Sequence, residues 1–345
     1  MVAKAVVSLL FEKSLAPDLI REQQSNICDC HPELVSGFNG KEASKGNILS
    51  DWIPEQVRND ELPLIVIVGP TASDKTGLAI RLAQKFDGEI ISADSRAIYR
   101  GMDIGTAKPT AAEQAQVKHW GIDLAEPDER FTVADFQKYA NEKIAEIRSH
   151  SKIPFLVGGS GLYIDSVIFD YDFSDRADDE LREKLDKMSV EELQDYCNDS
   201  NISLPENHKN KRYLMRAIER KNVVKNNRQK IRDDAIIIGI ETDKEVLRKR
   251  IADRAEKMFC DELYEETKKL AEKYSFNLES MKSNIYPIVW RMLNGEISRD
   301  EAVFFSQTDD WHLAKKQMTW FRRNPEIKWL PLEEIEDYLV KKLSF

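Results

Sequence analysis

Continuous apolar runs alternate with amphipathic stretches along the middle of the chain. The runs LIVIVG from Leu64, IISAD at 90–94, PFLVGG at 154–159 and AIIIGIE at 235–241 have the length and β-branched content of buried parallel strands. The stretches KTGLAIRLAQKF and VADFQKYANEKIAEIRSH repeat apolar residues at spacings of three and four, which predicts helices. Strands and helices therefore alternate, and we predict an α/β fold with a doubly wound parallel sheet.

Three further regions flank or interrupt this pattern. Residues 172–233 contain charged amphipathic stretches, which predicts a helical lobe inserted into a core formed by residues 61–171 and 234–345. The chain from Lys244 onward is also predicted to be helical. Residues 1–60 carry scattered proline and glycine without an apolar run of core length, so we predict an atypical N-terminal extension with partial order.

Composition and charge indicate the cellular compartment and limit the kinds of partner that we expect. The four cysteines are too few and too scattered for a disulfide framework, so we expect a reducing compartment and a cytoplasmic protein. The sequence has no apolar run of about 18 residues, which argues against membrane insertion. The net charge of -10 at pH 7 argues against indiscriminate nucleic-acid binding, although a local basic surface can still bind it. Nothing indicates an obligate partner, and we expect a monomer.

The turn after the first strand has the spacing of a phosphate-binding loop. Gly69 is followed by four residues, position 74, Lys75 and Thr76, and only position 74 departs from the motif. Backbone N–H groups and the helix N-terminus of such a loop face phosphate oxygens, the lysine adds a charge, and the threonine can hold Mg²⁺. The motif alone is typical of nucleotide- and ATP-binding proteins. The candidate ligand-binding residues are Gly69, Pro70, Thr71, Ala72, Ser73, Asp74, Lys75 and Thr76.

Asp74 stands where the motif has glycine. Its Cβ lies where close backbone approach is needed, and its carboxylate would repel a phosphate by about 4 kcal/mol per charge pair at an effective dielectric of about 20. Aspartate tolerates positive φ, its side chain can turn to solvent, and a carboxylate can join Mg²⁺ coordination. The sequence leaves these three routes open, and we expect Asp74→Gly to raise activity.

Two more turns follow strands that should end at the same edge. ADSRAIYRGMDIGTAKP at 93–109 places Asp94 and Ser95 after the second strand, where an acid can serve as Mg²⁺ ligand, general base or helix cap. VGGSGLY at 157–163 places Ser160 after the third strand, where its hydroxyl can donate to an oxyanion. We therefore predict that three turns share one site.

Basic residues are concentrated in the predicted lobe. Between 208 and 232, Glu219 is the only acid. A charge run of this kind is typical of a nucleic-acid contact or of a solvated face. Its members are Lys209, Lys211, Arg212, Arg216, Arg220, Lys221, Lys225, Arg228, Lys230 and Arg232.

Five segments together resemble the tRNA dimethylallyltransferase family. They are GPTASDKT, ISADSRAIYRGMDIGTAKP, VGGSGLY, RAIE and AKKQMTWFRR, and the resemblance runs from about Leu64 to Trp329. It implies a P-loop NTPase-like core whose loop holds the diphosphate of dimethylallyl diphosphate with Mg²⁺, and not ATP. It further implies transfer of the dimethylallyl group to N6 of the adenosine immediately 3′ of the tRNA anticodon, giving N6-isopentenyladenosine and diphosphate.

The resemblance also implies roles for individual residues. Lys75, the loop amides and Arg250 or Arg254 would neutralise the leaving diphosphate, Asp94 would be the catalytic base, and Ser160 would contact the reacting centre. The lobe would bind the anticodon stem-loop. The implied tRNA contacts are Asp94, Ser95, Arg96, Ala97, Ser160, Arg182, Arg212, Tyr213, Leu214, Met215 and Arg216.

Several residues depart from the family pattern. Besides Asp74, they are Tyr213 for an arginine, Glu262 for a glycine, Ile285 in a glycine-tyrosine pair, and Asp310, Trp311 and His312 for threonine, arginine and glutamine. These departures support a second hypothesis, a degenerate member that keeps the fold and RNA binding with little catalysis. A third hypothesis, a P-loop small-molecule kinase, has no use for the basic lobe.

Overall fold

The structure is a computed structural model that describes residues 62–171, 173, 179–219, 230–282 and 285–343. The predicted extension at 1–60 and the part of the basic run at 220–229 lie outside the described residues. The described chain forms one six-stranded sheet in the order β3-β2-β4-β1-β5-β6, and every neighbouring pair is parallel. The predicted parallel sheet is thus confirmed.

The four predicted strands are all present, and two edge strands were missed. The strands are β1 (Leu64–Val68), β2 (Gly88–Ser92), β3 (His119–Trp120), β4 (Ile153–Gly158), β5 (Ala235–Glu241) and β6 (Lys328–Pro331). The missed strands, β3 and β6, have two and four residues and no fully buried position, so they lack the apolar run that marks the central strands.

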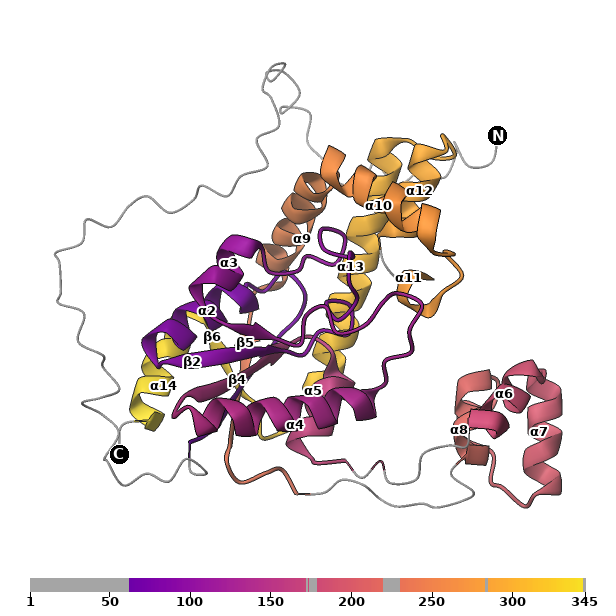
Figure 1. The fold of residues 1–345 in the computed structure, drawn as a ribbon, viewed down its shortest axis with the longest axis horizontal. Coiled ribbons are helices and arrows are strands. Elements are labelled where there is room, and N and C mark those ends of the chain that lie inside the picture. Colours follow the sequence, from indigo (N-terminus) through magenta and orange to yellow (C-terminus); the bar gives the residue numbers. More distant parts are fainter. Residues whose placement is uncertain (1–61, 172, 174–178, 220–229, 283–284, 344–345) are drawn as a thin grey trace. The chain divides into compact units, whose positions relative to one another are not determined.

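Alternate residues of β1 belong to two separate hydrophobic cores, one on each face of the sheet. Leu64, Val66 and Val68 belong to the first core, which includes side chains of α4 (Val133–Ser149) and α5 (Gly161–Ile168). Ile65 and Ile67 belong to the second core, which includes side chains of α2 (Lys75–Lys85) and α14 (Ile335–Leu343). Figure 1 shows these helices around the sheet. Helices on both faces make the sheet doubly wound, as predicted.

The chain after β5 is mainly helical, as predicted, apart from β6. Tyr286 and Phe321 from this region are fully buried in the first core, so the C-terminal helices extend the hydrophobic interior beyond the sheet. Within the described residues no helix is long and apolar enough to cross a membrane. The remaining elements outside the lobe are α3 (Ala111–Gln116), α9 (Lys244–Met258), α10 (Asp261–Lys273), α11 (Glu279–Lys282), α12 (Tyr286–Leu293), α13 (Arg299–Phe321) and the 3₁₀ turn η2 (Leu332–Glu334).

The insertion between α5 and β5 is helical and has a core of its own. It consists of α6 (Asp179–Lys187), α7 (Val190–Asp199) and α8 (Lys211–Glu219) (Figure 1). Leu193 of α7 and Leu214 of α8 are fully buried in one cluster with Leu185 of α6. Each helix therefore buries one apolar stripe against the other two, which is what its amphipathic pattern requires.

Candidate active site

The loops that follow β1, β2 and β4 meet at the carboxyl edge of the sheet. Ser160 Oγ accepts a hydrogen bond from Ser95 N–H at 2.9 Å and donates to Ser95 Oγ at 3.1 Å, which joins the β2 and β4 loops. The Asp94 carboxylate raises the pKa of Lys75, so it lies within electrostatic reach of the β1 loop. The structure thus brings Lys75, Asp94 and Ser160, which come from three loops, to one edge.

The loop that is predicted to bind phosphate, residues 69–76, curves around its own first residues. The carbonyl of Pro70 accepts hydrogen bonds from Lys75 Nζ at 2.5 Å and from Ser73 N–H at 3.3 Å. Ala72 and Asp74 have φ values of 61° and 65°, in the left-handed region, on either side of Ser73. Alternating backbone handedness of this kind forms a concave turn whose N–H groups can surround an anion. α2 starts at the next residue, so its N-terminal dipole adds to the same concavity.

Lys75 is the most strongly perturbed cation of this edge. Its pKa is lowered from the ordinary 10.5 to about 8, mainly by burial and also by the nearby Arg254, while Asp94 and Asp74 oppose the shift. The ammonium has lost water and has only partial compensation from the two carboxylates. An anion bound in the loop would restore that compensation, so the electrostatics favour binding of a negatively charged ligand.

The two arginines expected to help with diphosphate are in different environments on α9. Arg254 lies near Lys75 and pairs with Asp310 of α13 at 2.6 Å, with both side chains mostly buried. Arg250 is exposed on the same helix. Asp310 is one of the departures from the family pattern, and it partly neutralises the arginine that is nearest to the phosphate loop.

Helix α13 covers the edge with two residues that were not predicted to have a specific role. Gln317 Oε1 accepts a hydrogen bond from Thr71 N–H at 2.7 Å. A Cβ on Gly159 would lie 2.3 Å from Gln317 Nε2, so a larger residue there would displace the Gln317 amide. Trp320 Nε1 donates to Asp165 Oδ2 at 2.8 Å. Both residues belong to the AKKQMTWFRR segment, so a signal was present, but its contact partners could not be read from it.

Asp94 is held in place by its own loop. Its Oδ1 accepts a hydrogen bond from Arg96 N–H at 2.8 Å, and the residue is only partly buried. Arg96 reaches the C-terminal helices, where its Nη1 donates to the carbonyl of Ser280 at 3.2 Å. The carboxylate is therefore oriented by the backbone and still accessible to a substrate.

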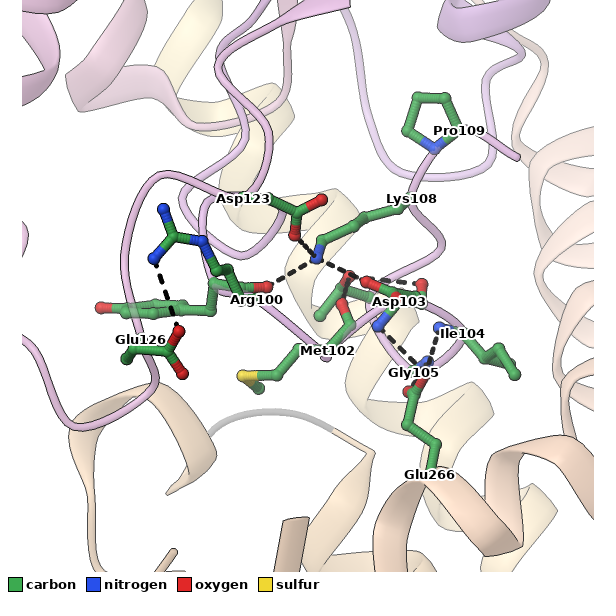
Figure 2. Close-up of polar contacts among 12 residues, drawn as sticks. Arg100, Met102, Asp103, Ile104, Gly105, Lys108, Pro109, Asp123, Glu126 and Glu266 are labelled. Carbon is green, nitrogen blue, oxygen red and sulfur yellow. Dashed lines mark hydrogen bonds and ion pairs between the residues drawn. The ribbon is translucent and has the colours of Figure 1, made fainter. Parts of the chain in front are cut away.

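The loop after β2, residues 102–109, is fixed by a carboxylate from a distant helix. Glu266 of α10 accepts hydrogen bonds from the N–H groups of Asp103, Ile104 and Gly105 at 3.1, 2.9 and 3.0 Å (Figure 2). Its Oε1 also accepts from the Tyr286 hydroxyl at 2.7 Å. Burial and the adjacent carboxylate raise the pKa of Tyr286, so this hydroxyl stays protonated and remains a donor.

A buried lysine fixes the same loop from within. Lys108 Nζ lies 2.6 Å from Asp103 Oδ1, Asp123 Oδ1 and the carbonyl of Tyr99 (Figure 2). Its side chain is 4% exposed, so the ammonium has exchanged water for these three oxygens. The loop beside Asp94 is thus a rigid platform, and Lys108 is used for structure and is not available as a ligand.

The expected tRNA contacts are divided between exposed and buried residues. Arg212, Tyr213 and Arg216 are exposed on α8, and Arg182 of α6 pairs with Glu219 at 3.1 Å. Three further expected contacts have buried side chains, so they would have to contact RNA through the backbone, and they stay predictions. They are Ala97 at 3% exposure, Leu214 at 0% and Met215 at 3%.

Comparisons of sequence and of structure find known proteins that are similar to this chain. Residues 97–324 match the family model described as IPP transferase. The tRNA dimethylallyltransferases of Bacillus velezensis and Acetivibrio thermocellus are 35% and 39% identical over 301 residues, covering 83% and 82% of this chain and 96% of each relative. The crystal structure of the tRNA isopentenylpyrophosphate transferase from Bacillus halodurans has a TM-score of 0.62 at 34% identity, covering 81% of this chain and 96% of that one. The chain belongs to the IPP transferase family.

Proposed function

We propose that this protein transfers a dimethylallyl group from dimethylallyl diphosphate to N6 of the adenosine immediately 3′ of the anticodon in tRNA. The products are N6-isopentenyladenosine and diphosphate. The observation that carries the proposal is the meeting of Lys75, Asp94 and Ser160 at one edge of the sheet. The names of the relatives support both the transferred group and the tRNA substrate.

The phosphate-binding loop is suited to hold the leaving diphosphate. Its concave backbone, the α2 N-terminus and the Lys75 ammonium all favour a polyanion. Ser73 Oγ is buried in this loop without a hydrogen-bond partner among the described residues. Buried polar atoms normally have partners, so this hydroxyl supports a polar ligand in the loop.

The oxygen donors of the loop also fit Mg²⁺. Thr76 lies in the first turn of α2 next to Lys75, and within the described residues no group of three His, Cys, Asp or Glu side chains forms a metal cage. Mg²⁺ often takes one or two protein oxygens and completes its shell with phosphate oxygens and water. Thr76 would hold the ion, which when bound neutralises charge on the diphosphate.

Asp94 is placed to accept the proton of the nucleophile. In the transfer, the C–O bond to diphosphate breaks, the bond from C1 of the dimethylallyl group to N6 forms, and N6 loses one proton. The Asp94 carboxylate, oriented by Arg96 N–H, takes that proton. Ser160, bonded to Ser95, would contact the reacting centre. The adenine must leave its stack to reach these groups.

The lobe is suited to hold the RNA. The stretch at 208–219, at or near α8, is positively charged in an acidic protein, through Lys209, Lys211, Arg212 and Arg216. Tyr213 is 46% exposed on that helix and can stack on an unpaired base. Phosphate contacts from the cations would supply affinity that weakens with added salt.

Nucleoside analysis of tRNA tests this function. Purified protein is incubated with unmodified tRNA, Mg²⁺ and dimethylallyl diphosphate, and the tRNA is then digested to nucleosides. We expect N6-isopentenyladenosine and an equal amount of released diphosphate. Retention of tRNA without this nucleoside would support the degenerate family member, and phosphorylation of a small molecule by ATP would support the kinase.

A further inference from the structure

The Asp74 side chain does not act as the helix cap that its position suggests. Asp74 is the N-cap residue of α2, with φ 65° and ψ 33°, and its side chain makes no capping hydrogen bond. An N-cap side chain reaches the N–H groups of the first turn from an extended backbone. The left-handed backbone of Asp74 points the carboxylate in another direction.

Gly77 provides the space that the carboxylate occupies. A Cβ at this position would lie 2.7 Å from Asp74 Oδ1, and its three nearest neighbours would all be atoms of that carboxyl group. Any other residue would therefore displace the carboxylate. Glycine is unfavourable inside a helix, so its presence in the first turn of α2 has a specific use at this place.

Arg81 lies on the same stripe of α2, one turn beyond Gly77. Its Nη1 is 3.9 Å from Asp74 Oδ2, and the two side chains are 51% and 50% exposed. Positions 74, 77 and 81 are spaced by three and four residues, so they follow one face of the helix. The carboxylate consequently lies over Gly77 and within reach of Arg81 on an exposed part of α2.

We propose that Gly77 and Arg81 are positioning residues that hold the Asp74 carboxylate outside the phosphate loop, so that the loop still accepts an allylic diphosphate. This inference rests on the proposed function and extends it to the residue that departs most clearly from the loop motif. Of the three routes by which Asp74 could be tolerated, positive φ and a solvent-facing side chain act together here. Coordination of Mg²⁺ by Asp74 is not needed.

Binding of dimethylallyl diphosphate to the full chain in Mg²⁺ buffer, measured by calorimetry, tests the proposal in two backgrounds. Arg81→Ala and Gly77→Ala are each made in the native chain and in Asp74→Gly. In the native chain we expect each to weaken binding about three- to fivefold, the range of an exposed ion pair. In Asp74→Gly we expect less than about twofold, because no carboxylate remains to be positioned.

Two controls separate positioning from general charge and general stability. Arg81→Lys keeps the cation and should restore most of the affinity. Lys85→Ala removes a cation of the same helix that already pairs with Glu336 at 2.5 Å, so its effect should be equal in both backgrounds. In steady-state kinetics the Arg81→Ala change should raise KM for dimethylallyl diphosphate and leave KM for tRNA unchanged.

The outcomes distinguish this inference from the proposed function. Equal weakening by Arg81→Ala in both backgrounds would overturn the positioning role while the diphosphate site stands. Absence of binding in every variant, Asp74→Gly included, would overturn the proposed function itself. If Gly77→Ala does not fold, the Arg81 pair of measurements decides.

Discussion

Two loops reach the same edge of the sheet, and they are held there in different ways. The phosphate-binding loop after β1 is shaped largely by contacts within itself, with Lys75 and Ser73 both bonded to the carbonyl of Pro70. The loop after β2 takes its shape from Glu266, which lies more than 160 residues away in sequence and binds three consecutive N–H groups. The first loop therefore takes its curvature mainly from local contacts, with one hydrogen bond from Thr71 N–H to Gln317 of α13. The second loop adds to its internal Lys108 contacts three hydrogen bonds to a C-terminal helix.

Substitutions in the two loops should therefore have different consequences, for diphosphate binding in the first and for stability in the second. A locally encoded loop keeps its curvature as long as its own residues are kept, so changes there should act on diphosphate first. A loop held by a distant carboxylate should respond to changes in α10 with lost stability.

The largest effect is expected for the base at the start of the second loop. Asp94→Asn keeps an oxygen that can accept from Arg96 N–H but cannot take a proton, so kcat should fall about 10²- to 10⁴-fold. Asp94→Ala should abolish transfer while tRNA binding stays close to native. Single-turnover assays and filter binding measure the two effects, and transfer that survives in Asp94→Ala would assign the base to another group.

Removal of the distant support should cost stability. Glu266→Ala leaves three N–H groups and the Tyr286 hydroxyl without their acceptor, which should lower the free energy of unfolding by roughly 3 kcal/mol. Urea denaturation measures this loss, and hydrogen exchange should show faster exchange at residues 103–105. Glu265→Ala is the matched control, because Glu265 is 60% exposed and its pair with Lys268 at 2.7 Å lies at the surface, where an ion pair contributes little to stability. Equal losses in both variants would remove the distinction between the two loops.

Binding of dimethylallyl diphosphate at the first loop should depend on pH. Lys75 has a pKa of about 8, and bound diphosphate favours its charged form, so affinity for dimethylallyl diphosphate should be constant well below pH 8 and fall up to about tenfold per unit above it. The Lys75→Arg variant keeps its positive charge over this pH range, so the pH dependence of its affinity reports ionisation of the substrate alone. The free energy of unfolding should change with pH in the opposite direction. Because the folded protein lowers the pKa of Lys75 from 10.5 to about 8, the charged lysine destabilises the fold fully below pH 8, and this destabilisation disappears as the pH approaches 10.5. If the affinity of the native chain and that of Lys75→Arg depend on pH in the same way, this role for Lys75 is contradicted.

The smallest effect is expected in the lobe, outside both loops. Replacing Lys209, Lys211 and Arg212 together with alanine should weaken tRNA binding and reduce the slope of log affinity against log salt by about 2. Binding of dimethylallyl diphosphate should not change. An unchanged slope would reassign these cations to the solvated surface.

Local patterns were sufficient for the framework of this protein. The four central strands, the helices α2 and α4 and the helical insertion all follow from apolar periodicity within short windows. The edge that joins Lys75, Asp94 and Ser160 also follows, because parallel strands place their carboxyl ends together. Leu214 and Met215 could have been recognised as buried from the same periodicity, since they share a stripe with Ile218.

The sequence by itself determined the sheet, the loop spacing and the location of the site, because these depend on residues near one another in the chain. Only the tertiary structure decided how the loops are supported and where Asp74 points. Glu266 and Gln317 meet their backbone partners across 163 and 246 residues at most, and no local pattern specifies such pairs. The direction of the Asp74 carboxylate depends on a backbone angle and on open space at Gly77, and both are properties of the folded helix that no local sequence pattern specifies.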